Sequence, residues 1–85
     1  MIEPTVNNNG NTRDDLASQA MEIHNAIRVV IGLISTSDIS HGRNFQTVRD
    51  STKHAIAQME RQTHLNLLQK LSDDYLKLAI AISKQ

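Results

Sequence analysis

Apolar residues recur along residues 16–34 at alternating steps of four and three. The series is Leu16, Ala20, Ile23, Ile27, Val30 and Ile34. Such steps keep side chains on one stripe of an α-helix, and an unbroken run of them is typical of helices that pack along their length. The series therefore predicts a long amphipathic helix that packs on another helix.

The start of this helix is marked by Thr12, Asp14 and Asp15. A threonine followed three residues later by an acid matches a capping box, and acids suit the positive end of the helix dipole. We expect the helix over about 13–35, a length of about 34 Å. Gly32 costs about 1 kcal/mol there relative to alanine, so we expect another helix backbone to approach it closely. A short strand over 28–34 is the alternative, given the β-branched residues there.

The second half of the chain predicts further helix. Residues 35–42 are small and polar and end in Gly42, which predicts a loop. Asn44 suits a helix N-cap, and neither glycine nor proline follows it. The apolar stripe rotates by roughly 90° across residues 60–64, on a helix with about 100° per residue. We therefore expect two helices, over about 44–62 and 64–84. One long helix over both ranges is the alternative.

Composition narrows the fold class. The chain has 85 residues, no cysteine, and only Phe45 and Tyr75 as aromatics. Disulfides and thiolate metal sites are thereby excluded, and so small a domain is marginally stable unless something else supports it. We predict an all-α protein, a small bundle of two to three helices completed by dimerisation. Residues 1–11, with Pro4 and a run of asparagines, are expected to be a disordered segment. Residues 12–85 are expected to form a single helical domain.

The residues that carry catalysis or bind metals are not arranged for either task. The four histidines, His24, His41, His54 and His64, form no pair at the three- or four-residue spacing of a helical metal site. The chain has no Gly-x-Ser-x-Gly turn, and three glycines cannot build a phosphate-binding loop. We therefore expect no enzyme activity, no cofactor and no metal.

Two segments, 27–34 and 76–82, are apolar on more than one side. Three short helices cannot easily cover both, so these segments are expected to contact a second molecule. The candidate interaction residues are Ile27, Val30, Ile31, Ile34, Leu76 and Ile80. We predict a non-enzymatic interaction module, a homodimer that acts as a regulator, adaptor or inhibitor of another protein. Proteins of this kind and size are common in bacteria and their phages, an analogy from size and class alone.

Charge supports an alternative function. Residues 1–42 hold five acids and two bases, whereas residues 43–85 hold four acids and seven bases. Arg43, Arg49, Lys53 and Arg61 define a basic face within residues 43–64 that suits phosphates, so the alternative is a nucleic-acid-binding regulator. No basic and apolar leader is visible, and the longest apolar run, residues 29–34, is too short to span a bilayer. We therefore expect a cytoplasmic location and no membrane contact.

Overall fold

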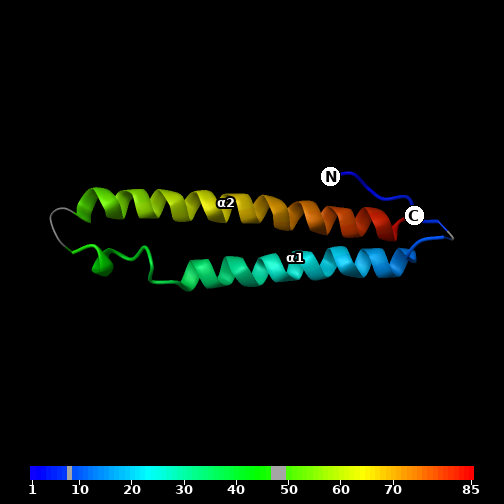
Figure 1. Ribbon diagram of the computed structural model, residues 1–85, viewed down its shortest axis with the longest axis horizontal. Helices are drawn as coiled ribbons and strands as arrows, with labels where there is room; N and C mark the ends of the chain where they lie inside the picture. Colours follow the sequence, from blue (N-terminus) through cyan, green and yellow to red (C-terminus); the bar gives the residue numbers. More distant parts are fainter. Residues whose placement is uncertain (8, 47–49) are drawn as a thin grey trace.

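The protein is an antiparallel hairpin of two α-helices (Figure 1). The computed structural model describes residues 1–7, 9–46 and 50–85. Helix α1 spans Arg13–Thr36, a 3₁₀ turn η1 spans Gly42–Asn44, and helix α2 spans Asp50–Ser83. The all-helical prediction is confirmed, because the described residues contain no strand. We call the end of the hairpin that carries residues 37–46 the loop end.

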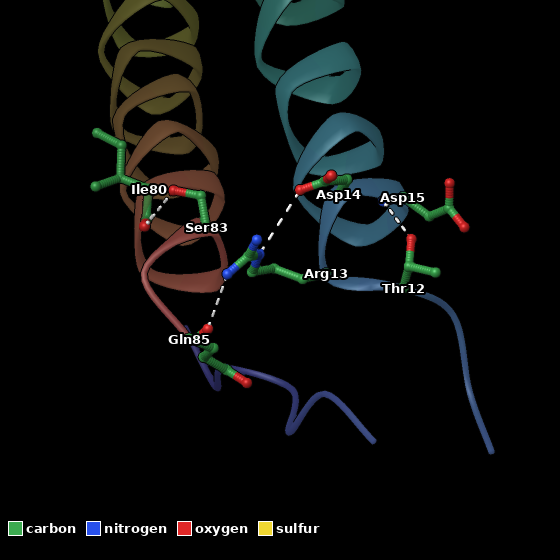
Figure 2. Close-up of polar contacts among 7 residues, drawn as sticks. All are labelled: Thr12, Arg13, Asp14, Asp15, Ile80, Ser83 and Gln85. Carbon is green, nitrogen blue, oxygen red and sulfur yellow. Dashed lines mark hydrogen bonds and ion pairs between the residues drawn. The ribbon is translucent and has the colours of Figure 1, made fainter. Parts of the chain in front are cut away.

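Helix α1 begins where the sequence predicts. The Thr12 hydroxyl accepts a hydrogen bond from the Asp15 backbone N–H at 3.1 Å, as Figure 2 shows. This bond satisfies one of the N–H groups that a helix start leaves without a partner. At the other end the N–H of Ser37 donates to the carbonyl of Ile34. The prediction of a helix over about 13–35 is confirmed, and the alternative of a strand over 28–34 is wrong.

The two helices meet along one line of residues on each, which we call the inner seam. On α1 its members are Ala20, His24, Ile27, Ile31 and Ile34; on α2 they are Ala57, Arg61, Leu65, Leu68, Ser72, Tyr75, Ala79 and Ile82. All of them are buried or half-buried. Three contacts fix the register. His24 Nδ1 lies 2.7 Å from the Ser72 carbonyl oxygen, Arg28 donates to Gln69 at 2.9 Å, and Arg61 donates to the Ser35 carbonyl at 3.1 Å.

The expected break near residues 60–64 does not exist, because α2 is continuous from Asp50 to Ser83. The prediction of separate helices over 44–62 and 64–84 is therefore wrong, and the alternative of one long helix describes this region. The start expected at Asn44 is also wrong, since Asn44 belongs to η1. The apolar residues Ile56 and Met59, which precede the expected break, are 50% and 70% exposed.

The inner seam of α2 explains how one helix stays in contact with α1. Ala57, Arg61 and Leu65 follow one another at two successive steps of four, where a heptad has alternate steps of four and three. Such an insertion shifts the packing face locally without interrupting the helix. The inward residues there are a small alanine and an arginine whose guanidinium reaches the Ser35 carbonyl. The inner seam therefore has no large apolar residue at positions 57 and 61.

This packing leaves the protein long and thin. The hairpin measures 63 × 18 × 17 Å, and its radius of gyration is 18.5 Å. A compact domain of this length would have a radius of gyration of about 12 Å. Among the described residues only Ala20, Ala79 and Ile82 are buried apolar residues. One seam per helix is therefore a very small core.

The segment before α1 lies against the end of α2. The Arg13 guanidinium donates to the Gln85 carbonyl at 3.1 Å and also approaches Asp14 at 3.6 Å (Figure 2). The Val6 N–H donates to the Gln85 side chain at 3.0 Å, and Met1 and Glu3 line a depression beside Leu78 and Ala81. These contacts join the two ends of the described chain.

Gly32 does not have the role predicted for it. A Cβ added to Gly32 would meet no atom of the described residues within 4 Å, so no helix backbone among them approaches it closely. The expectation of a tight helix contact at Gly32 is wrong within the hairpin. Its flexibility is therefore a cost to α1 that the fold of one chain does not offset.

Gly32→Ala should consequently stabilise the protein by about 0.5–1 kcal/mol, because alanine restricts the unfolded chain and meets open space in the folded one. Urea denaturation followed by circular dichroism at fixed protein concentration measures this gain. Gly42→Ala is a useful contrast, because a Cβ there would meet the His54 ring at 3.4 Å. A loss of stability in Gly32→Ala would mean that another chain approaches this glycine.

Candidate interaction surface

The two sides of the hairpin that flank the inner seam differ in character. In an antiparallel helix pair, residues that flank the seam on one side of α1 lie beside residues on the same side of α2. The hydrogen bond from Arg28 to Gln69 identifies one flank. Asn25 and Asp73, both exposed, belong to the same flank by helical spacing. We call it the polar flank.

The opposite flank is apolar, and we call it the outer face. Its members are Ile23, Ala26, Val30 and Leu33 of α1 and Leu67 and Leu71 of α2. All six are exposed, among them Val30 at 41% and Leu33 at 65%. An apolar patch of this extent on a small protein is a typical mark of a contact with another molecule.

An ionised carboxylate limits the outer face toward the terminal end of the hairpin. Asp74 lies on this side of α2, three residues after Leu71. The Lys70 ammonium donates to Asp74 Oδ2 at 3.0 Å, and this hydrogen bond lowers the pKa of Asp74 below its ordinary value. Beyond Asp74, Met1 and Glu3 line one depression together with Leu78 and Ala81. The open part of the outer face is therefore the middle and the loop-end half of the hairpin.

At the loop end the outer face opens into a concave site of about 440 Å³, which we call the loop-end cavity. Its apolar lining comes from both helices and the loop: Leu33, Ile34, Ile39 and Ala57. Its polar side chains are Glu60, Arg61 and His64 of α2. Ile39 is 84% exposed, so its side chain is open to contact by another molecule. A mostly apolar hollow with a few polar groups at one side is suited to an inserted apolar group.

The loop that forms one wall of this cavity is attached to α2. The Gln58 side chain donates to the carbonyl of Ser40 at 2.8 Å, and Ser40 is buried. The rings of Phe45 and His54 stack with their centres 5.5 Å apart. Because of these contacts, the wall made by Ile39 and Ser40 is held in place rather than formed only on binding.

The candidate interaction residues from the sequence lie in three different environments. Ile27, Ile31 and Ile34 are half-buried in the inner seam, where they hold the hairpin together. Val30 lies on the outer face. Leu76 is half-buried and Ile80 is 45% exposed, both on the side of α2 that carries the polar flank. The structure does not bring these six residues together.

The predicted basic face is also dispersed. Arg43 forms an ion pair with Asp38 in the loop, and Arg61 donates to the Ser35 carbonyl at the end of α1. Lys53 is exposed. Arg49 lies outside the described residues. Two of the four basic side chains thus face partners in their own chain.

A histidine–serine pair lies in the middle of the inner seam. His24 Nδ1 is 2.7 Å from the carbonyl oxygen of Ser72 and 3.0 Å from its hydroxyl oxygen. Because a carbonyl only accepts, Nδ1 must carry a proton and cannot act as a base toward this hydroxyl. Ser72 is 0% exposed, so no substrate reaches it. The pair is therefore a buried polar contact that fixes the register of the helices.

The described residues contain no group of three or more metal-binding side chains. Within the same residues, neither helix is both long and apolar enough to cross a membrane. No protein-family model, no curated protein and no solved structure matches this chain.

Sequence reasoning missed three features of this surface. It merged the outer face with the inner seam into one stripe, although Ile23, Ala26, Val30 and Leu33 have their own spacing of three, four and three. It considered His24 as a metal ligand and missed its place inside the inner seam. The loop-end cavity has no sequence signal, because it depends on how residues 37–40 fold back.

The histidine–serine pair makes a testable contribution to stability. Ser72→Ala should lower the free energy of unfolding by up to about 1 kcal/mol, because the imidazole N–H keeps the carbonyl of residue 72 but loses the buried hydroxyl as a second acceptor. In a His24→Leu background the same substitution should cost much less, because both polar groups are then gone. Urea denaturation of the four proteins at one concentration gives this double-mutant cycle, with exposed Ser18→Ala as control. Equal losses in both backgrounds would contradict the pairing.

Proposed function

We propose that this chain is a non-enzymatic helical interaction module, working as a homodimer, that binds and regulates another protein as an adaptor or inhibitor. The observation that carries the proposal is the amount of surface that the hairpin leaves open, which includes large apolar side chains such as Leu33 and Leu67. Its accessible surface is 6345 Å². A compact monomer of 9.5 kDa exposes about 5,000 Å². The difference is of the size that protein contacts bury.

The loop-end cavity is the site that we assign to the regulated partner. Leu33, Ile34 and Ala57 give it an apolar lining, to which the exposed side chain of Ile39 also belongs. Glu60 and His64 supply both hydrogen-bond donors and acceptors at one side. An apolar anchor side chain of a partner, flanked by polar backbone, fits this chemistry. Buried anchors of this kind dominate the energy of most protein interfaces.

The chemistry of the buried groups supports a role in contact rather than in catalysis. In the one described serine–histidine pair, the His24 Nδ1 that faces the Ser72 hydroxyl carries a proton and so cannot activate that hydroxyl as a nucleophile. Ser72 is also closed to solvent. The nucleic-acid alternative loses support for a similar reason, because Arg43 and Arg61 are turned to partners within the chain.

The test is capture of a partner by the full chain, immobilised and exposed to extract of the native host. Ile39→Glu should abolish capture of a partner seen with the unaltered chain, because a carboxylate cannot enter an apolar hollow without a counter-charge. Ile2→Glu is the matched control, since Ile2 is equally apolar, 95% exposed and outside the cavity. Quantitative mass spectrometry compares the three samples.

The expected result is a protein retained in near-stoichiometric amount by the unaltered chain and by Ile2→Glu, and reduced at least tenfold by Ile39→Glu. Circular dichroism should show the same helix content in all three. A set of captured proteins that does not change with Ile39→Glu would contradict the assigned site and with it the proposed function.

A further inference from the structure

The outer face of α1 is itself a second packing seam. Ile23, Ala26, Val30 and Leu33 follow at steps of three, four and three, the spacing that keeps residues in line along a helix partner. None of the four is charged, and all four are exposed. Leu67 and Leu71 extend the same side of the hairpin on α2. A helix pair with one seam occupied and a second one open has the geometry of half a larger bundle.

The angle between the two seams supports this conclusion. With about 100° per residue, the outer face of α1 points about 90–100° away from the direction of α2. In a four-helix bundle of square section, the directions from one helix to its two neighbours are about 90° apart. The apolar series recognised first in the sequence, with Ala20, Ile27 and Ile34 alternating with Ile23 and Val30, lies between the two directions. It would point to the axis of such a bundle.

The most apolar line of α2 also lies between the inner seam and the side of the outer face. In the C-terminal half of the helix this line runs through Leu71, Tyr75, Leu78 and Ile82. It alternates between residues of the inner seam and residues on the side of the outer face. Both helices of one chain therefore direct their most apolar side toward one line outside the hairpin. The two missing helices of a bundle would complete the packing around that line.

The area is sufficient for a stable contact. From their exposed fractions, the six residues of the outer face together with Ile56, which is in line with Leu67, present on the order of 600 Å². This area is at the lower end of what each partner buries in a standard protein interface. The polar flank offers no comparable area in the middle of the hairpin, where Arg28 and Gln69 face solvent.

We propose that the occupant of the outer face is a second copy of this chain, so that two hairpins form a four-helix bundle in which neighbouring helices are antiparallel. This inference rests on the proposed function and names the partner at the outer face. A second copy presents the same uncharged stripe of α1, so an isologous contact places no charge of that stripe against another. A second copy is also present wherever the chain is made. A hairpin with only three buried apolar residues among those described needs a partner that is always available.

Analytical ultracentrifugation of the purified full chain between about 1 and 100 μM tests the proposal. The unaltered chain should sediment as a dimer of about twice 9.5 kDa. Val30→Asp should raise the dimer dissociation constant at least 100-fold, because it places an unpaired charge in the contact. Val29→Asp is the matched control: Val29 is the next residue, is 63% exposed and points away from α2. It should leave the dissociation constant within about threefold.

A second measurement covers the case in which Val30→Asp unfolds. Since the chain contains no cysteine, single cysteines can be placed at will. Ala26→Cys lies on the outer face and Asn25→Cys on the polar flank, and both positions are exposed. A flexible bis-maleimide should convert Ala26→Cys into a covalent dimer at least tenfold faster than Asn25→Cys.

Two results would overturn the proposal: a chain that stays monomeric at 100 μM, or cross-linking of Asn25→Cys as fast as that of Ala26→Cys. These failures are separate from failure of the proposed function. A monomeric chain that still retains a partner sensitive to Ile39→Glu would refute the homodimer and leave the regulatory role intact. A dimer with no such partner would refute the regulatory role and leave the bundle intact.

Discussion

The inner seam between α1 and α2 sets the limits of this molecule. Two helices bury only the narrow stripe that each turns to the other, and here that stripe includes a serine, a histidine and an arginine as well as aliphatic residues. Ser72 and His24 satisfy each other at its centre, and Arg61 reaches a carbonyl at the end of α1. These polar members fix the register but contribute little apolar burial. Because stability depends mainly on apolar burial, a hairpin held in this way has only a small free energy of folding.

How far the sequence predicted the fold differs between the helices. For α1, the cap at Thr12, the apolar spacing and the polar loop after residue 35 all agreed, and the structure has these bounds within one residue. For α2, the apolar residues Ile56 and Met59 lie outside, whereas Ala57 and Arg61 lie inside. A small residue and a long charged residue carry no hydrophobic signal, so the true inward line could not be read from one sequence. The apparent rotation of the stripe was taken for a break in the helix.

The candidate site was less predictable than the fold, for a related reason. Periodicity identifies an apolar stripe but does not say how many partners share it. The series through Leu16, Ile23 and Val30 was read as one seam, and the structure divides it between a half-buried side and an exposed one. The loop-end cavity depends on the hydrogen bond from Gln58 to Ser40, a contact between residues eighteen positions apart. Tertiary contacts of this kind leave no local pattern in the sequence.

Two features of α1 that look unfavourable in a single hairpin become consistent in a bundle. One is the uncharged outer face, which would be a liability on a monomer because exposed apolar stripes promote non-specific association. The other is the direction of its most apolar line, which bisects the inner seam and the outer face instead of pointing at α2. A helix that packs on one partner is expected to centre its apolar stripe on that partner. The stripe of α1 is centred between two, so its sequence is suited to a corner position among four helices.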